Sequence, residues 1–181
     1  MQKRTQLHSC VGVFALALSL KQVLSLSLLT TLVVLSVGNL RAQGKDPLAG
    51  TWKLDIAKST FAGPAPQSGT RVFEDLGGGV MYVTNDGAGA QGNKTGNRIV
   101  FKRDGKDYPI AALGQTGYVT IAFTVKSKKP FTADYVTKID GKVNANATES
   151  LSADGKTYTV VTKGTNPQGQ PVTSTTVYDK Q

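Results

Sequence analysis

The chain has 181 residues, a net charge of +9, and one Cys, one His and one Trp. Cys10 and His8 both lie within the first 42 residues, so the other 139 residues contain neither. Such a domain excludes a Ser-His-Asp triad, a Cys nucleophile, a disulfide and the usual zinc or haem ligands. We therefore expect no catalytic residues, no bound metal and no cofactor.

Residues 1–42 have the composition of an export signal. They hold four basic and no acidic residues, together with the apolar runs Val11–Leu20 and Val23–Val37. The second run suits a signal peptide and is short for a membrane span, which needs about 20 apolar residues. We expect a signal peptide at 1–42, or an uncleaved anchor, before an exported domain at 43–181. That domain would be periplasmic or secreted, and its net charge is +5.

After residue 43 the sequence is typical of short strands joined by tight turns. Asp-Gly, which supplies the positive φ angles of hairpin turns, occurs four times. Alternating apolar residues between these turns predict one buried face per strand. One helical turn is expected at Asp55–Ser59. The expected strands are Gly50–Leu54, Thr70–Asp75, Val80–Asn85, Arg98–Arg103, Tyr108–Ala112, Tyr118–Lys126, Thr132–Ile139, Lys142–Ser152, Thr157–Lys163 and Pro171–Asp179.

Two of these segments alternate with particular regularity. In Tyr118–Lys126 the pattern puts Ile121 and Phe123 on one face. In Lys142–Ser152 it puts Val143, Ala145, Ala147 and Leu151 on one face, which only Glu149 interrupts. Ten short strands joined by hairpins close most economically into an up-and-down barrel, which leaves no exposed edges. We therefore predict an all-β antiparallel barrel of about 8–10 strands, with a two-sheet sandwich as the alternative, and a monomer.

A resemblance to the lipocalins follows from the start of this domain. Gly50-Thr-Trp52 matches the G-x-W motif that opens the first strand of lipocalins and related calycin barrels. The longer stretches 50–61 and 152–171 resemble exported bacterial lipocalin-like proteins without an assigned function. The resemblance implies structural roles for Gly50 and Trp52. It implies that Trp52 seals one end of the barrel against a basic side chain such as Lys180 or Lys163.

Several side chains are candidates for binding a ligand inside the barrel. Aromatic residues on inward faces can line an apolar pocket, although they can equally fill the interior. An inward arginine can pair with a ligand carboxylate, whereas an outward one is solvated. The candidate residues are Tyr82, Phe101, Tyr118, Phe123, Tyr135, Arg71 and Arg98.

Other patterns in the sequence favour solvated turns and loops. The basic clusters 102–106 and 126–129 fall at predicted turns, where solvated charges are expected, and export argues against nucleic-acid binding. The Gly-rich segment Asp86–Asn97 is expected to form a loop at the barrel mouth. Glu74 and Asp75 are adjacent in a strand and point to opposite faces, so they do not form an acid/base pair.

These patterns lead to two functional hypotheses and weigh against catalysis. The first is an exported lipocalin-like protein that binds a small hydrophobic or amphipathic ligand and is not an enzyme. The alternative is an envelope or periplasmic interaction protein, or an inhibitor-like barrel, that acts through loops Ala62–Gly69 and Gly87–Gly96. Either protein would contact a membrane only through its N-terminal segment.

Overall fold

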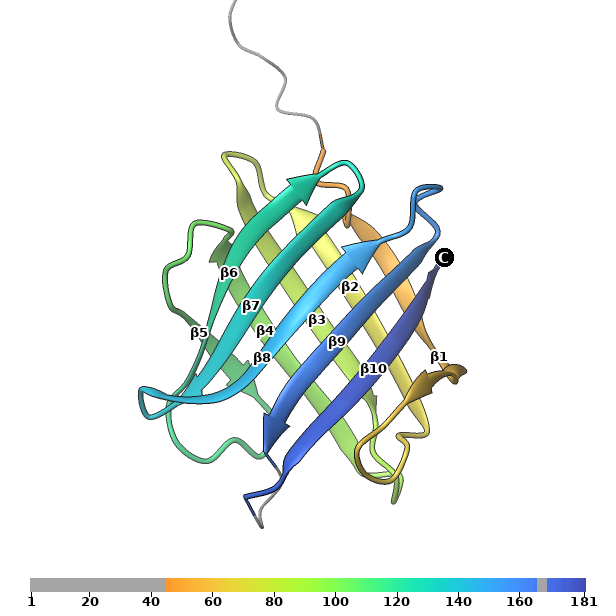
Figure 1. Cartoon of the computed structure of the whole chain (residues 1–181), viewed down its shortest axis with the longest axis vertical. Coiled ribbons are helices and arrows are strands. Elements are labelled where there is room, and N and C mark those ends of the chain that lie inside the picture. The colour runs from red at the N-terminus through yellow and green to blue at the C-terminus, as the bar shows by residue number, and fades with distance from the viewer. Residues whose placement is uncertain (1–44, 166–168) are drawn as a thin grey trace, which may run out of the picture. The chain divides into compact units, whose positions relative to one another are not determined.

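The computed structural model describes residues 45–165 and 169–181, which form ten antiparallel strands (Figure 1). The predicted signal segment lies outside the described residues. The strands are β1 (Gly50–Thr60), β2 (Ser68–Asp75), β3 (Val80–Ala88), β4 (Lys94–Lys102), β5 (Tyr108–Ala112), β6 (Val119–Lys128), β7 (Phe131–Ile139), β8 (Lys142–Leu151), β9 (Thr157–Thr165) and β10 (Pro171–Lys180).

The ten strands form one closed barrel. Each strand pairs with its neighbours in sequence, and β1 also pairs with β10, so Trp52 lies between Arg71 of β2 and Lys180 of β10. Closure leaves no sheet edge open along the ladder. The prediction of an all-β antiparallel barrel is confirmed, and all ten predicted strands are present, although β1 extends to Thr60 rather than Leu54 and β4 begins at Lys94 rather than Arg98.

The two ends of the barrel differ. Residues 45–49 cross the end where β1 begins, which we call the closed end; it lies at the top of Figure 1. The β1–β2, β3–β4, β5–β6 and β7–β8 connections meet at the opposite end, which we call the mouth. Among the described residues there is no helix that is long and apolar enough to span a bilayer.

An aromatic cluster fills the barrel interior near the closed end. Trp52, Tyr158 and Leu48 are fully buried, and the rings of Trp52 and Tyr158 lie 5.6 Å apart. Phe73 meets Tyr158 edge to face at the same centroid distance. Such tilted and perpendicular ring pairs are the favoured aromatic geometries. The aromatic cluster therefore packs one end of the barrel and leaves the other end to the site described below.

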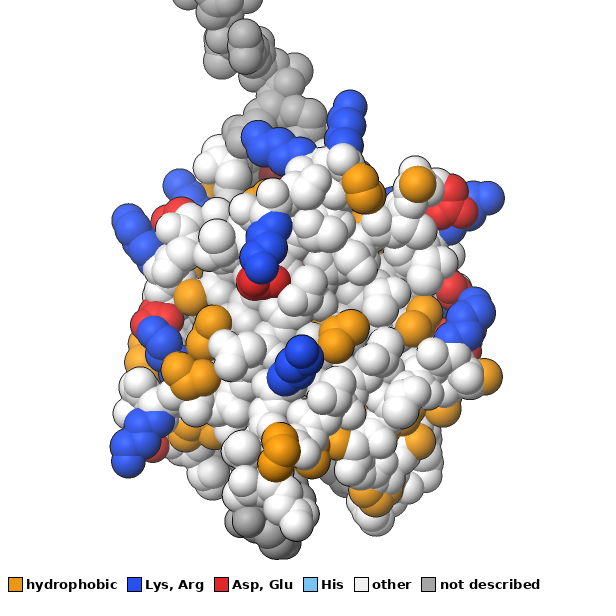
Figure 2. Space-filling model, in the orientation of Figure 1, with side chains coloured by type: hydrophobic (Ala, Val, Ile, Leu, Met, Phe, Trp, Pro, Cys, Tyr) orange, Lys and Arg blue, Asp and Glu red, His pale blue; other side chains and the backbone are white. Residues whose placement is uncertain are grey.

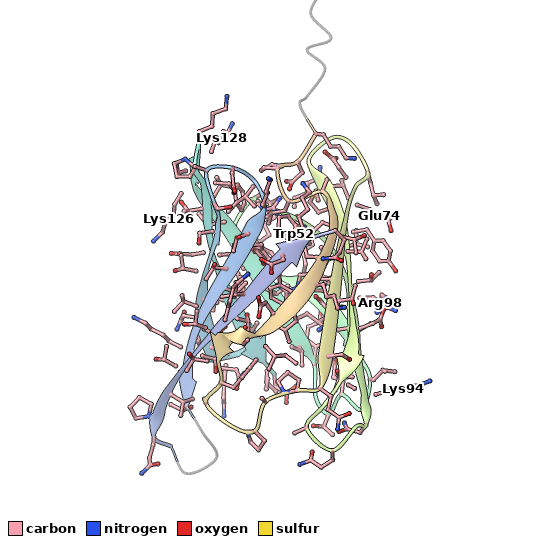
Figure 3. All side chains as sticks on the ribbon, turned by 90° about the vertical axis from the view of Figure 1, so that its right-hand side faces the viewer. Trp52, Glu74, Lys94, Arg98, Lys126 and Lys128 are labelled. Atoms are coloured by element: carbon pink, nitrogen blue, oxygen red, sulfur yellow. The ribbon has the colours of Figure 1, made fainter. Side chains whose placement is uncertain are left out.

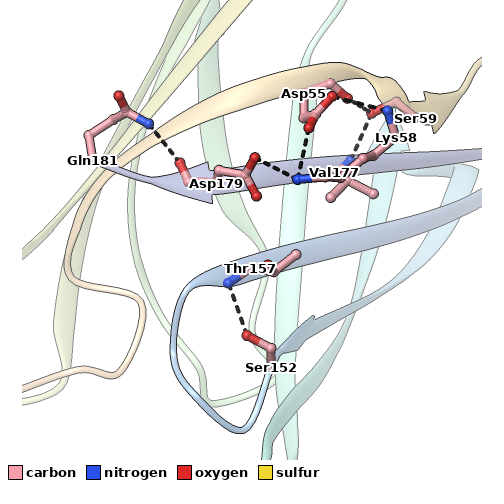
Figure 4. Close-up of polar contacts among 8 residues, drawn as sticks. All are labelled: Asp55, Lys58, Ser59, Ser152, Thr157, Val177, Asp179 and Gln181. Atoms are coloured by element: carbon pink, nitrogen blue, oxygen red, sulfur yellow. Dashed lines mark hydrogen bonds and ion pairs between the residues drawn. The ribbon is translucent and has the colours of Figure 1, made fainter.

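The predicted helical turn at Asp55–Ser59 is wrong, because these residues belong to β1 (Figure 4). The pairing with β10 shifts register between Asp55 and Thr60. Within this irregularity the Lys58 amide donates to Asp55 Oδ1 (3.0 Å) and the Ser59 hydroxyl donates to the Asp55 carbonyl (2.6 Å). Ser59 Oγ also accepts the Val177 amide of β10 at 2.9 Å. The local contacts are helix-like, but the segment stays in the sheet.

Two further expectations need correction. Thr137 pairs with Ala145 but Lys138 pairs with Val143, so a bulge turns Val143 to the outer face, where it is 60% exposed. The Gly-rich segment 86–97 is mostly strand rather than loop, because Asp86–Ala88 extends β3 and Lys94–Asn97 begins β4. Bulges change the face of every residue beyond them, which alternation in the sequence does not reveal.

The backbones of β2 and β3 approach closely near the mouth, so a methyl group added at Gly87 is expected to destabilise the protein more than one added at Gly63. A Cβ at Gly87 would lie 2.4 Å from the Ser68 carbonyl oxygen, whereas a Cβ at Gly63 meets nothing within 4 Å. Gly87→Ala is expected to lower the free energy of unfolding by about 1–3 kcal/mol, because β2 and β3 must move apart. Gly63→Ala should change it by less than about 0.5 kcal/mol. Urea unfolding of both variants measures the difference, and equal effects would contradict the prediction.

Candidate functional site

A small cavity occupies the barrel interior between the closed end and the mouth. This inner chamber has a volume of about 140 Å³. The rings of Phe101 and Phe123 stack with centroids 4.1 Å apart, and Tyr135 packs against Phe123 at 5.2 Å. The chamber wall is therefore flat and aromatic on one side. Its aliphatic lining consists of Val83, Ile99, Ile110 and Ile121.

Three polar side chains form a neck between the inner chamber and the mouth. Arg71, Asn85 and Asn97 line both the inner chamber and a second cavity of about 230 Å³, which we call the vestibule. Arg71 Nε donates to Asn85 Oδ1, and Asn85 Nδ2 donates to Asn97 Oδ1 at 2.6 Å. These bonds orient the three side chains across the passage between the two cavities.

Arg71 is held in the neck by tyrosines of the last two strands. Its register opposite Trp52 directs it into the barrel, where its guanidinium lies 4.9 Å from the Tyr178 ring centroid and 5.5 Å from that of Tyr158. Arg71 Nη1 donates to the Tyr158 hydroxyl at 2.9 Å. A guanidinium stacked on aromatic rings is fixed in place while its outer N–H groups stay free to donate. Arg71 is partly exposed, so solvent reaches it.

A buried polar cluster continues from Tyr158 to the closed end. The Tyr158 hydroxyl donates to Glu149 Oε2 at 2.7 Å, and Glu149 Oε1 lies 3.6 Å from Arg103 Nε. Arg103 Nη1 in turn pairs with Asp46, which precedes the barrel. Glu149 is 1% exposed and the Arg103 side chain 8% exposed. Two strands, β8 and β9, and two segments outside the strands thus contribute to one chain of polar contacts that passes through the core.

Burial changes the acidity of two members of this cluster. The pKa of Glu149 is raised because burial disfavours its carboxylate, although Arg103 and the Tyr158 hydroxyl oppose the shift. The pKa of Tyr158 is raised well above its usual value by burial and by the neighbouring Glu149 carboxylate. Tyr158 is therefore neutral at physiological pH, and its hydroxyl links Arg71 to Glu149.

The closed end is sealed by the segment that precedes β1. Trp52 Nε1 donates to the Leu48 carbonyl at 2.8 Å, and the Asp46 amide donates to Asp75 Oδ2 at 2.9 Å. The Lys180 ammonium lies 5.2 Å from the Trp52 ring centroid, as the resemblance to lipocalins implied. Gly50 leaves room for it, since a Cβ there would lie 3.3 Å from Lys180 Cε. Access to the chamber is therefore from the mouth.

The structure brings four of the seven predicted ligand-binding residues to the chamber. Phe101, Phe123, Tyr135 and Arg71 line it. The inward placement expected for the other two aromatic residues is wrong. Tyr118 is 60% exposed, and Tyr82 pairs with Glu74 and Val100 on the outer face between the buried residues Met81 and Val83.

The remaining candidate, Arg98, is also on the outside of the barrel. Figure 3 shows Arg98 pointing away from the barrel while Trp52 lies inside it. Arg98 Nη2 binds both carboxylate oxygens of Asp86, at 2.9 and 3.0 Å. Of the two arginines considered, Arg71 points into the barrel and Arg98 points outward.

Sequence reasoning missed several residues of the site. Arg103 belongs to a basic cluster that was expected to be solvated, but it turns inward over Phe131, at 5.0 Å from the ring centroid. Nothing in the sequence pointed to Asn85 or Asn97 as site residues, because polar residues are common at the ends of strands. Glu149 did give one, as the acidic residue that interrupts an otherwise apolar face.

The comparisons with known proteins do not identify a family. No protein-family model matches this chain, and no curated protein matches it. Within 45–165 and 169–181 no group of three or more metal-ligating side chains is close enough to hold a metal ion. The chemistry of the site must therefore be argued from the chamber itself.

The arrangement is suited to holding an amphipathic molecule. An apolar chamber with a few polar groups at one point is the usual form of a small-molecule site. The aromatic wall accepts a flat or aliphatic group, and the outer N–H groups of Arg71 are positioned to meet an anion.

The buried cluster predicts that Arg103 is a strong determinant of stability. Arg103→Met leaves Glu149 and Asp46 without their cation and is expected to lower the free energy of unfolding by about 3–5 kcal/mol. Arg98→Met removes a surface pair and should cost about 0–1 kcal/mol. Adding Glu149→Leu to Arg103→Met should recover part of the loss. Urea unfolding at neutral pH measures all three, and equal costs for the two arginine variants would contradict the prediction.

Proposed function

We propose that this chain is an exported, lipocalin-like binding protein for a small amphipathic anion. The apolar part of the ligand enters the inner chamber, and its anionic group meets Arg71 at the neck. The observation that carries the proposal is a partly exposed arginine that points into the barrel and lines both the inner chamber and the vestibule. Binding rather than catalysis is the activity we assign.

The size of the cavities supports a small ligand. A dry cavity of about 150 Å³ is known to hold a single benzene ring, and the inner chamber has about 140 Å³. Together with the 230 Å³ vestibule, it reaches the lower end of the volumes that ligand pockets occupy, about 300 Å³. The ligand that fits this space has one apolar group and a polar group close to it, rather than two long chains.

The charge at the neck supports an anion. Among the described residues, Arg71 is the cation that lines both cavities. The side-chain amides of Asn85 and Asn97 beside it can donate or accept hydrogen bonds. A guanidinium that keeps free N–H groups binds a carboxylate or sulfonate through charge-assisted hydrogen bonds. A neutral apolar ligand would use the chamber without using this group.

The lipocalin-like assignment rests on agreement between two observations. The G-x-W tryptophan lies at the closed end under Lys180, and the barrel is antiparallel with sequential strands. Lipocalins share this arrangement of a sealed end and an open mouth. We extend the likeness to function only as far as binding in the interior.

A pair of fluorescent probes tests the proposal. 8-Anilinonaphthalene-1-sulfonate and N-phenyl-1-naphthylamine share an aromatic skeleton, but only the first carries a sulfonate. Arg71→Met is expected to weaken binding of the sulfonate probe by about 10- to 100-fold, the range expected for lost charge-assisted hydrogen bonds. Binding of the neutral probe should change by less than about threefold. Fluorescence titration gives both dissociation constants.

The outward-facing Arg98 provides the matched control. Arg98→Met removes the same charge from β4, which is separated from β2 by β3, and should leave both affinities unchanged. Weakening of both probes to the same extent by Arg71→Met would indicate a general loss of structure, which its urea midpoint would report. If neither probe binds the wild-type protein, or if Arg71→Met leaves the sulfonate affinity unchanged, the proposed function is wrong.

Export predicts a defined mass for the mature protein. If residues 1–42 are a signal peptide, protein isolated from its own host begins at Gln43. Intact mass spectrometry should therefore find a chain of 139 rather than 181 residues. A full-length chain in the membrane fraction would support the uncleaved anchor instead. A full-length chain in the cytoplasmic fraction would contradict export.

An exposed apolar surface supports a second candidate function, that of an interaction protein. Tyr118, Ile139 and Val143 are exposed and lie close together, since β6 and β8 both pair with the end of β7. Figure 2 shows hydrophobic side chains at the lower left, where Figure 1 places the β7–β8 turn. This surface differs from the loops predicted for a partner. Loss of a partner from periplasmic pull-downs with Tyr118→Ser, but not with Arg71→Met, would favour this alternative.

A further inference from the structure

Arg71, Glu149, Arg103 and Asp46 belong to one connected cluster whose formal charges cancel. Asp46 and Glu149 each contribute one negative charge, and Arg71 and Arg103 each contribute one positive charge. The titratable and charged groups that face Glu149 are Arg103, which directly follows β4, Tyr158 from β9, Tyr135 from β7, Arg71 from β2 and Asp46 from the segment before β1. Tyr158 is neutral, so a bound anion would add a negative charge that no described cation offsets.

We propose that binding of an anion at Arg71 is coupled to uptake of one proton by Glu149. The inference rests on the proposed function, because it requires an anion at the neck. In the complex, the Arg71 guanidinium interacts with two negative groups, the anionic group of the ligand and the Glu149 carboxylate. Protonation of Glu149 removes one of them and restores the charge balance of the interior. The proton comes from solvent, and it returns to solvent when the ligand leaves.

The geometry connects the two sites directly. Arg71 Nη1 donates to the Tyr158 hydroxyl at 2.9 Å, and that hydroxyl donates to Glu149 Oε2 at 2.7 Å. A single hydroxyl therefore separates the guanidinium from the carboxylate. Glu149 also lines the inner chamber, so an anion in the neck and the Glu149 carboxylate face the same small space. Two negative charges so close together in a weakly polar interior repel each other strongly.

Glu149 is the acidic group best placed to accept the proton. It is 1% exposed, and within the described part of the chain its Oε1 atom has no hydrogen-bond partner, although Arg103 Nε lies 3.6 Å away. Burial raises the pKa of its carboxyl group, and a second negative charge nearby shifts the pKa in the same direction. Asp46, by contrast, forms an ion pair with Arg103 and accepts the Leu48 amide at 3.0 Å.

The sign of the pH dependence follows from this linkage. Between the pKa of Glu149 in the free protein and its higher pKa in the complex, the unliganded protein holds the carboxylate and each anion bound takes up a proton. Affinity for the anion then rises as pH falls, by up to about tenfold per pH unit for one proton. Below the pKa of free Glu149 the proton is already bound, and the affinity becomes constant.

Fluorescence titration with 8-anilinonaphthalene-1-sulfonate from pH 8 to pH 5 tests the coupling, because its sulfonate stays ionised throughout. The wild-type protein should bind this probe more tightly as pH falls. Glu149→Gln, which keeps an acceptor for Tyr158, should bind it with nearly constant affinity. Glu74→Gln changes the only other glutamate, which is exposed on the outer face, and should behave as wild type.

Calorimetry of the wild-type protein provides a measurement that needs no variant. The binding enthalpy of the same probe at neutral pH should differ between phosphate and Tris buffers by an amount that corresponds to uptake of up to one proton. Equal enthalpies, or an unchanged pH slope in Glu149→Gln, would overturn the coupling. If either result accompanies a loss of affinity in Arg71→Met, the proposed function stands without it. If Arg71→Met binds the probe as wild type does, the proposed function itself fails.

Discussion

Pairing between the first and last strands is the constraint on which the rest of the structure depends. Residues 43–181 contain no Cys, and the described residues contain no helix, so neither a disulfide nor a helical layer can hold this domain together. The closed ladder leaves no edge strand to be covered by another element. It also places Arg71 and Lys180 on either side of Trp52, which seals the closed end while an arginine reaches the neck.

The order of the strands was predictable because turns and alternation agree in this sequence. Three of the four Asp-Gly pairs lie between strands, whereas Asp86-Gly87 lies inside β3, and most strands alternate as a half-buried strand should. The prediction failed where the chain departs from regular pairing. The helix-like contacts of Lys58 and Ser59 with Asp55 are genuine, but pairing with β10, which includes the bond from the Val177 amide to Ser59 Oγ, keeps this segment in the sheet. A contact between residues more than a hundred positions apart is not visible in local sequence.

The site was predictable only where the pattern of a strand is unambiguous. Phe123 alternates with polar or small neighbours, so its inward direction followed from the sequence. The run Val80–Val83 is apolar throughout, so nothing in it shows that Tyr82 faces outward. Arg103 shows a different limit. A basic residue beside a turn is usually solvated, but here Asp46 and Glu149 compensate its burial from two other parts of the chain. Compensation of a buried charge depends on the assembled fold rather than on neighbours in sequence.

Closure by the two terminal strands also determines when the barrel can form. Trp52 is paired with Lys180, so the first strand lacks one partner until the last residues of the chain are present. Bringing such distant segments together costs loop-closure entropy before their contacts repay it, which makes folding slow. During synthesis, one edge of β1 therefore stays unpaired until β10 has been made. Such an unpaired edge can join strands of other chains until the barrel closes.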